Sequence, residues 1–361
     1  MRLVRRIRGG SVDDFLAEAK PEHKMALINA GQNSNGWPVV GPDGRLWYDG
    51  ADGNGTVDAV DPTTGAIQTY PVRYVPPDGG TMTYRGPIAL DGSGDVWLVG
   101  EQGPVTPTST RTLIRLTVAT GATARFAEPP GCLDFSTGSH YLFGESDGSV
   151  WLQCVVSNGG STDLYRITAD GTITPVTLPP SFKQLGLLAA GADGAVWTLG
   201  EQNATIGLAR LDRGGLVAFY PDSITVRFTG ITGNGSGALI ALVACGSGVP
   251  GDICYDAVGP DGGLTPLGTV SNVRQIGPLG MDQRGTLWAV AALSTNPPDT
   301  QDLLAIDQAG KATTYPFHIA LNGVAEVVTP VGPPAITPDG TVWSATSSTD
   351  LLNTLLRAGP Y

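Results

Sequence analysis

Residues 41–47 read Gly-Pro-Asp-Gly-Arg-Leu-Trp, a turn sequence followed at once by a large β-forming side chain. The Asp-Gly pair favours a tight turn because glycine tolerates positive φ and aspartate hydrogen-bonds its own backbone. Close copies of the last five residues each end on a tryptophan and lie at 43–47, 93–97, 147–151, 193–197, 284–288 and 339–343. A divergent seventh copy, at 236–240, ends on Ile240 instead. The chain is therefore built from seven related units.

Successive copies are separated by 50, 54, 46, 43, 48 and 55 residues, counted between their last residues. This interval fits a blade of four β-strands rather than a helical repeat. Three units finish their fourth strand on Tyr-Pro, at Tyr70, Tyr220 and Tyr315. Proline is tolerated there because a strand at the outer edge of a sheet does not need the backbone N–H donor that proline lacks. We predict an all-β fold, a seven-bladed β-propeller with four-stranded blades.

The two ends of the sequence are expected to complete each other. After Trp343 the last unit has room for one strand fewer than the others, whereas the apolar stretch 24–29 precedes the first unit without a partner. We predict that this N-terminal strand completes the last blade and closes the ring, which protects sheet edges. Residues 1–22 then form a leader with a short helix over 11–20, capped by Ser11. Residues 23–361 form a single propeller domain.

Composition excludes several classes of partner. The chain has 33 Asp and Glu against 21 Lys and Arg, a formal charge of −12, so a phosphate-binding surface and nucleic acid are not expected. No apolar run is long enough for a membrane span. The arginine-rich residues 1–10 lack the apolar segment of a secretory signal. We expect a monomer.

The four cysteines fall into two local pairs. Cys245 and Cys254 flank a glycine-rich loop, and Cys132 and Cys154 bracket the first strand of the third unit. Their spacing lacks the Cys-x-x-Cys pairs of zinc sites, so two disulfides are predicted. An extracytoplasmic or secreted location is preferred, although no signal peptide is seen; reduced thiols in the cytoplasm would leave the same sequence.

The repeat resembles that of the virginiamycin B lyases, or streptogramin lyases, a family of seven-bladed β-propellers. Residues 41–49, Gly-Pro-Asp-Gly-Arg-Leu-Trp-Tyr-Asp, follow the repeat pattern of that family, and the resemblance extends from about residue 37 to 361. It implies a carbon–oxygen lyase that opens cyclic depsipeptides by elimination. A base removes the proton α to a carbonyl, and magnesium supports the developing charge.

The resemblance also implies a catalytic pair on one blade, a histidine eleven residues before the tryptophan and a glutamate three after it. His140 stands eleven residues before Trp151, but Cys154 stands three after it. Glu101 and Glu201 come four residues after their tryptophans, and one residue of slip turns a strand side chain to the other face of its sheet. The pair is therefore absent.

Candidate site residues follow from these positions. His140, with Glu145 or Glu101 as the acid, is the candidate catalytic set, because strand starts face the tunnel of a propeller. Alternatively, His140 is a structural histidine, and the glutamates are exposed to solvent or cap turns. The residues expected to bind a ligand are Tyr141, Glu201, Arg85 and Arg274. Metal ligands are left unassigned.

Three function classes agree with the sequence. The first is a binding module that presents its tunnel-face loops to a small molecule, peptide, glycan or protein, without a cofactor. Long loops at 102–111, 246–253 and 294–301 favour it. The second is a lyase of the streptogramin type that uses magnesium. The third is a structural propeller, since one fold hosts many functions. We expect the binding module.

Overall fold

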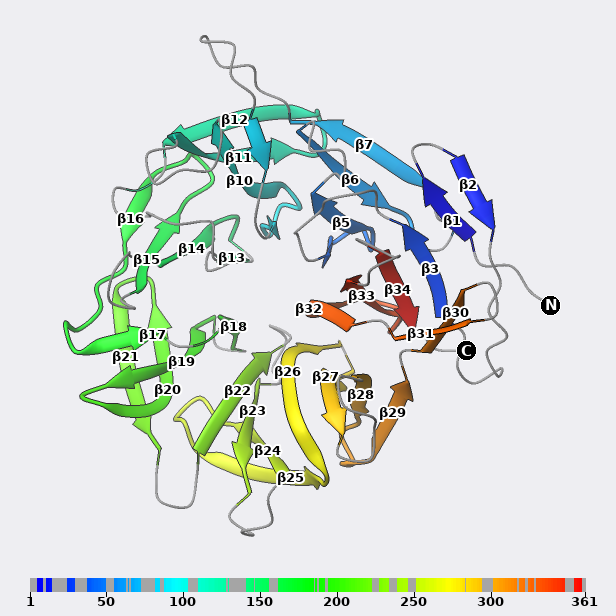
Figure 1. Ribbon diagram of the computed structural model, residues 1–361. Helices are drawn as coiled ribbons and strands as arrows, with labels where there is room; N and C mark the ends of the chain where they lie inside the picture. Colours follow the sequence, from blue (N-terminus) through cyan, green and yellow to red (C-terminus); the bar gives the residue numbers. More distant parts are fainter. Residues whose placement is uncertain are drawn as a thin grey trace. The chain divides into compact units, whose positions relative to one another are not determined.

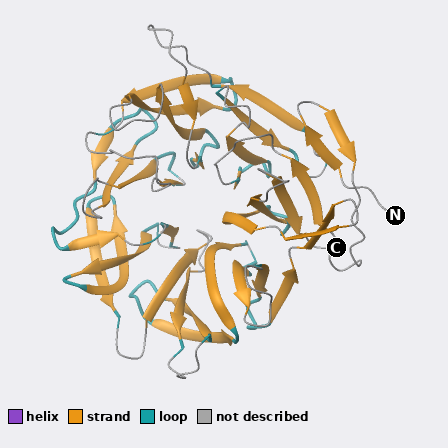
Figure 2. Ribbon diagram, in the orientation of Figure 1, coloured by secondary structure: helices purple, strands orange, loops and turns teal. Residues whose placement is uncertain are grey.

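The structure is a computed structural model. It describes residues 5–8, 11–14, 25–29, 38–49, 55–62, 64, 66–72, 82–84, 88–102, 110–127, 129, 141–145, 147–155, 162–184, 186, 188–191, 194–222, 227–233, 239–245, 251–282, 284–293, 301–316, 318–321, 324–327, 329–347 and 354–358. The regular elements of these residues are all β-strands, β1 to β34 (Figures 1 and 2). The predicted all-β class is confirmed.

The chain divides into two compact units. The first comprises Met1–Val176 with Thr341–Gly359 and Tyr361, and the second comprises Thr177–Gly340 with Pro360.

The first unit contains three sheets of consecutive antiparallel strands. The first sheet has β4 (Val39–Val40), β5 (Leu46–Asp49), β6 (Thr56–Val60) and β7 (Ile67–Pro71). The second sheet has β8 (Met82–Tyr84), β9 (Ala89–Leu90), β10 (Val96–Gln102), β11 (Thr110–Thr117) and β12 (Ala122–Ala127). The third sheet has β13 (Tyr141–Gly144), β14 (Val150–Val155), β15 (Thr162–Ile167) and β16 (Ile173–Pro175).

The first unit also contains the two ends of the chain. Strand β3 (Met25–Asn29) pairs along its whole length with β34 (Thr354–Ala358), which pairs in turn with β33 (Val342–Ser347). An N-terminal strand therefore extends the sheet that contains the last tryptophan strand, as the missing strand of the last repeat predicted.

The predicted N-terminal helix is wrong over residues 11–14. These residues form β2 (Ser11–Asp14), which pairs with β1 (Arg5–Arg8). The register sets Arg5 opposite Asp14 and Arg6 opposite Asp13. The backbone of these residues pairs as a hairpin, so the capping pattern at Ser11 does not start a helix. The rest of the predicted helix, 15–20, lies outside the described residues.

The second unit repeats the same plan. The fourth sheet has β17 (Phe182–Gln184), β18 (Ala189–Ala190), β19 (Val196–Gln202), β20 (Thr205–Asp212) and β21 (Gly215–Pro221). The fifth has β22 (Arg227–Gly233), β23 (Leu239–Ala244), β24 (Ile253–Val258) and β25 (Leu264–Val270). The sixth has β26 (Val273–Met281), β27 (Leu287–Leu293), β28 (Asp302–Ile306) and β29 (Ala312–Pro316). A hairpin of β30 (His318–Leu321) and β31 (Val324–Val327), and strand β32 (Thr329–Ile336), follow.

The repeated pentapeptide forms the turn and strand that were predicted. In all six tryptophan copies the glycine has φ between 75° and 84°, at Gly44, Gly94, Gly148, Gly194, Gly285 and Gly340. A side chain at such a φ is strained, so the Asp-Gly turn depends on glycine. Strands β7, β21 and β29 end on Pro71, Pro221 and Pro316, which confirms the predicted ends of the fourth strands.

The tryptophans form the core between neighbouring sheets. Trp97 packs among residues of the second and third sheets, and Trp197 among residues of the fourth and fifth. Both rings are almost completely buried, at 0% and 1% exposure. Truncating such a ring to alanine typically costs about 3–5 kcal/mol, so Trp97 and Trp197 each stabilise the packing of one sheet on the next.

Candidate functional site

A polar network in the second sheet shows what the acids near the tryptophans do. Asp91, six residues before Trp97, accepts hydrogen bonds from the backbone N–H groups of Ser93 (2.9 Å) and Asp95 (3.1 Å). Its other oxygen accepts the indole Nε1–H of Trp97 at 2.9 Å. Arg115, opposite Trp97 in register, lies 2.7 Å from Asp95 and places its guanidinium 5.7 Å from the centre of an indole ring. The network fixes both turn and ring.

Glu145, a predicted catalytic acid, occupies the equivalent position in the third sheet, six residues before Trp151. Its carboxylate accepts hydrogen bonds from Ser149 Oγ at 2.7 Å and from Arg166 Nε at 3.3 Å. Arg166 also binds Asp147 at 2.6 Å, and the side chains of Glu145 and Arg166 are only 12% and 15% exposed. Glu145 therefore holds the turn and the arginine of its own sheet.

The first sheet also places an arginine against its tryptophan ring, but the arginine comes from a different position. Ala59 is opposite Trp47, so the guanidinium comes from Arg45, two residues before the ring and 4.8 Å from its centre. Arg45 Nε lies 2.5 Å from Asp43. Burial raises the pKa of Asp43, but the hydrogen bonds and the charge of Arg45 together hold that pKa below its ordinary value. An arginine over the tryptophan is thus a repeated structural element.

The other predicted site residues lie as follows. Glu201 in β19 is half-buried and lies 3.6 Å from Lys183 Nζ, while Arg274 in β26 donates from Nε to the Leu293 carbonyl at 3.2 Å. Glu101 is paired with Arg111, and Tyr141 with Gln153, in strand register. The structure describes only the backbone of Glu101 and Tyr141. His140 and Arg85 lie outside the described residues, so the assembly of the catalytic set stays a prediction.

Two cysteine predictions can be compared with the structure. Cys245 and Cys254 form a disulfide with a Cα–Cα distance of 5.1 Å, as predicted. Cys154 in β14 is fully buried and disulfide-bonded. Cys132, its predicted partner, lies outside the described residues.

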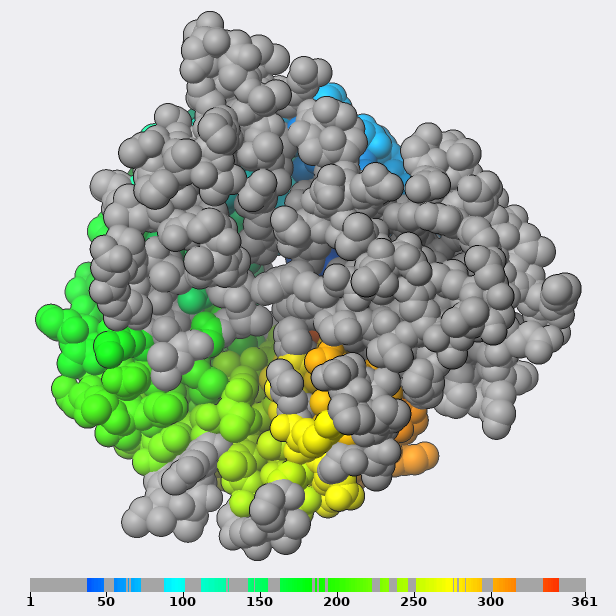
Figure 3. All heavy atoms as spheres, viewed as in Figure 1, coloured from blue at the N-terminus to red at the C-terminus, as the bar shows by residue number. Residues whose placement is uncertain are grey.

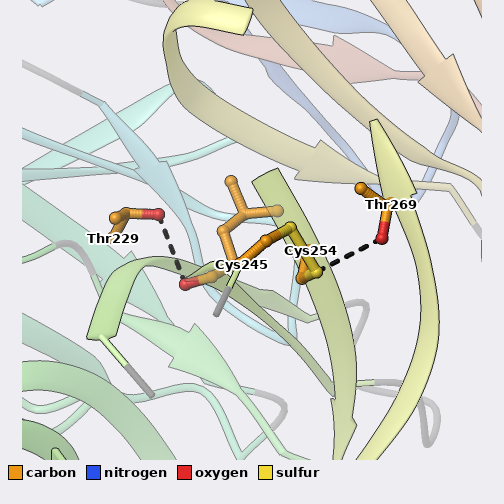
Figure 4. The surroundings of a disulfide bond; sticks show 5 residues. Thr229, Cys245, Cys254 and Thr269 are labelled. Carbon is orange, nitrogen blue, oxygen red and sulfur yellow. Dashed lines mark hydrogen bonds between the residues drawn. A yellow bond between two sulfur atoms is a disulfide. The ribbon is translucent and has the colours of Figure 1, made fainter. Parts of the chain in front are cut away.

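The Cys245–Cys254 bridge closes the base of the loop between β23 and β24 (Figure 4). Cys254 Sγ lies 3.2 Å from Thr269 Oγ1 on β25, and Thr229 on β22 donates a hydrogen bond to the Leu242 carbonyl of β23 at 3.3 Å. The loop therefore starts and ends on a base that the disulfide and these hydrogen bonds connect to all four strands of the sheet. In the fourth sheet, by contrast, the equivalent connection is the two-residue turn Asn203–Ala204.

A second ring, which the sequence did not predict, lies beside each of several tryptophans. Aromatic side chains of the fourth strands lie against the indoles, with ring centres 5.2–5.7 Å apart, in the pairs Trp47–Tyr70, Trp97–Phe126, Trp197–Tyr220 and Trp288–Tyr315. The available signal was the recurrent tyrosine of the Tyr-Pro strand ends. These rings belong to the core and not to a ligand site.

The described residues contain no group of three or more His, Cys, Asp and Glu side chains arranged to hold a metal ion. None of their elements is a helix that is long and apolar enough to cross a membrane.

Comparisons with solved structures identify the class of fold. A streptogramin B lyase structure superposes with a TM-score of 0.61 at 18% identity, covering 95% of this chain and 100% of that chain. The virginiamycin B lyase of Staphylococcus aureus gives 0.60 at 19%, covering 94% and 100%. The β-propeller domain of Cps50 (Swd1) from Myceliophteria thermophila gives 0.58 at 11%, covering 94% and 100%. No protein-family model matches this sequence, nor does any curated protein.

The protein is therefore an all-β propeller of four-stranded antiparallel sheets. Its fold is shared with the streptogramin B lyases along nearly the whole chain, as the resemblance of the repeats implied. At these identities the likeness establishes the fold.

Proposed function

We propose that the protein is a binding module that presents loops of the propeller's tunnel face to a small molecule, peptide, glycan or protein. The observation that carries this proposal is the disulfide-closed loop between β23 and β24. A loop whose ends are fixed on a rigid sheet has less conformational freedom to lose on binding, which favours affinity. On the face shown in Figure 3, part of the second unit, coloured green to orange, lies at the surface.

The acids and the cysteine near the tryptophans support binding over catalysis. The Glu145 carboxylate already accepts hydrogen bonds from Ser149 and Arg166 of its own sheet, so these contacts occupy it in a structural role. Cys154 stands where the streptogramin lyase pattern has its glutamate, and a buried disulfide sulfur neither accepts nor donates a proton. The lyase, with His140 as base and bound magnesium, is the alternative function.

The disulfide also supports an extracytoplasmic or secreted location, because such bonds persist in oxidising compartments. Membrane-impermeant thiol labelling of intact cells, with and without prior reduction, tests this location. Labelling of Cys245 and Cys254 only after reduction from outside supports it, and labelling only after lysis contradicts it.

The test of function compares the native chain with a variant in which residues 246–252 are replaced by Asn-Gly, the shortest hairpin turn. Both proteins are screened by biolayer interferometry against arrays of glycans and of short peptides. The matched control is Ala204→Gly, which gives the exposed hairpin turn of the fourth sheet the same Asn-Gly sequence. Saturable binding by the native chain and the control, lost in the loop variant, supports the proposal. Equal binding by all three proteins, or by none, contradicts it.

A further inference from the structure

The fifth sheet lacks both members of the ring stack that its neighbour has. In the fourth sheet, Trp197 is opposite Arg210 and its ring stacks on Tyr220, with centres 5.7 Å apart and planes at 16°. In the fifth, Ile240 takes the place of the tryptophan and is opposite Ala257. The position across from Tyr255 on the fourth strand, which corresponds to that of Tyr220, is Gly268. Three large side chains are thus replaced by Ile, Ala and Gly.

Tyr255 fills part of the vacated space from the third strand. A Cβ on Gly268 would lie 2.1 Å from the Tyr255 hydroxyl, so the tyrosine occupies the place of the missing fourth-strand ring. A Cβ on Gly310, in the next sheet's turn, would lie 2.7 Å from the same hydroxyl. Tyr220 approaches Gly262 of the fifth sheet in the same way. The space in the fifth sheet that corresponds to the Trp197 indole and the Arg210 side chain of the fourth sheet remains unfilled.

A cavity of about 310 Å³ lies at that place, between the fifth and sixth sheets, which Figure 1 shows side by side. Its apolar wall includes Ile240, Leu287, Ile306 and Leu267. Leu267 is 37% exposed, so the cavity reaches the surface. Ligand pockets in proteins start at about 300 Å³, which makes this one suited to a single small ring system.

The polar part of the cavity consists of Tyr255, Asp307 and Gln308. The Tyr255 side chain is 1% exposed, and its hydroxyl is buried without a hydrogen-bond partner among the described residues. Burial, and secondarily the charge of Asp307, raise the pKa of Tyr255, so the hydroxyl keeps its proton. A buried hydroxyl without a partner is costly, and a ligand atom would remove that cost.

We propose that this cavity binds a small planar heteroaromatic molecule of about the size of indole, with its ring between Ile240 and Leu267 and a polar atom directed at the Tyr255 hydroxyl. In the second, third and fourth sheets a tryptophan opposite an arginine takes this place, which makes a flat ring the shape that fits. The negative charge of Asp307 favours a neutral or cationic ring with an N–H group and disfavours a carboxylate.

This site is separate from the disulfide-closed loop. Adjacent residues of a strand point to opposite faces of its sheet, so Cys254 and Tyr255 face away from each other on β24. Ile240 and Tyr255 belong to the core cluster shared with the sixth sheet, whereas Cys254 packs against the cluster shared with the fourth. The inference therefore does not depend on the proposed function.

The experiment is a titration with indole by isothermal calorimetry, together with ¹⁹F NMR of 5-fluoroindole. The native chain should bind indole saturably and should bind benzoate at least tenfold more weakly. Ile240→Trp restores the ring from within and should abolish indole binding while melting at or above the native temperature. Ala257→Arg restores the guanidinium and serves as the second filling variant if Ile240→Trp does not fold.

Tyr255→Phe distinguishes the polar contact from simple filling. The Tyr255→Phe variant should bind indole several-fold more weakly than the native chain. Its affinity for naphthalene, which has no polar atom, should be unchanged. Absence of saturable indole binding by the native chain would overturn the inference. Equal binding by the native and a folded cavity-filled variant would overturn it as well.

Discussion

The fourth and fifth sheets are built on the same plan but differ in what fills the space beside them. The fourth has Trp197, Arg210 and Tyr220 and a two-residue hairpin turn, whereas the fifth has Ile240, Ala257 and Gly268 and a loop closed by a disulfide. Both are antiparallel sheets with an interrupted register, which shifts between Arg210 and Leu211 in the fourth sheet and between Tyr255 and Asp256 in the fifth. The ladder of backbone hydrogen bonds thus survives loss of the tryptophan, because the apolar strand residues still bury their side chains. The repeat secures the fold in one sheet and leaves room for a ligand in the other.

The largest difference between the two sheets should appear when each central residue is truncated. Trp197→Ala should lower the free energy of unfolding by about 3–5 kcal/mol, and Ile240→Ala by about 2 kcal/mol, because Ile240 has fewer atoms and already borders a cavity. Urea unfolding followed by circular dichroism measures both values. Equal costs would show that the fifth sheet is as tightly filled as the fourth.

Removal of the disulfide is expected to have the next largest effect. The double variant Cys245→Ser, Cys254→Ser removes a bond between residues that are nine positions apart in the sequence. Its free energy of unfolding should fall by about 2–3 kcal/mol, since the cross-link restricts the unfolded chain. Differential scanning calorimetry with and without reductant measures the change. A native protein whose melting temperature does not respond to reductant would contradict this expectation.

The propeller could be predicted from the sequence because its determinants are local. Each Asp-Gly turn, such as that at Gly94, and each following tryptophan is readable at a fixed offset. The closing strand was predictable from the missing strand of the last repeat. The ring stacks and the Arg115 network were not, because they depend on cross-strand register, which pairs residues far apart in the chain.

The candidate site was less predictable for the same reason. Glu145 is a candidate catalytic acid by residue type, and its position six residues before Trp151 also gives it hydrogen bonds at the turn, as Asp91 has before Trp97. The signal was present in the repeat alignment. The cavity beside Ile240 could be anticipated only as a missing tryptophan, since its volume depends on how Tyr255 repacks.

The hairpin turn of the fourth sheet should show a smaller effect. Ala204 has φ 62°, a conformation in which alanine is strained and glycine is not. Ala204→Gly should therefore stabilise the protein by about 1 kcal/mol. The control Ala124→Gly, at an exposed position of β12, should instead destabilise it by about 0.5–1 kcal/mol, because strand backbone entropy is lost there. Destabilisation by both changes in urea unfolding would contradict the turn geometry.

The smallest effect concerns Asp256, which takes the place of Ala209 of the fourth sheet. Burial raises its pKa, because removal from water disfavours the charged carboxylate in the folded protein. Stability from this group is complete below the ordinary pKa and is lost as pH rises through the raised one. Asp256→Asn should therefore raise the melting temperature by about 1–2 °C at pH 7 and by less at pH 3. The same increase at both pH values would contradict the linkage.

The most direct test of the account asks whether the propeller has streptogramin lyase activity. The purified protein is incubated with a type B streptogramin and magnesium, with and without chelator, and the products are separated by chromatography and fragmented in a mass spectrometer. Elimination opens the ring without changing the mass, whereas hydrolysis adds one water. We predict intact antibiotic under all conditions. A ring-opened isomer that disappears with chelator and with His140→Ala would contradict the binding proposal and establish the lyase.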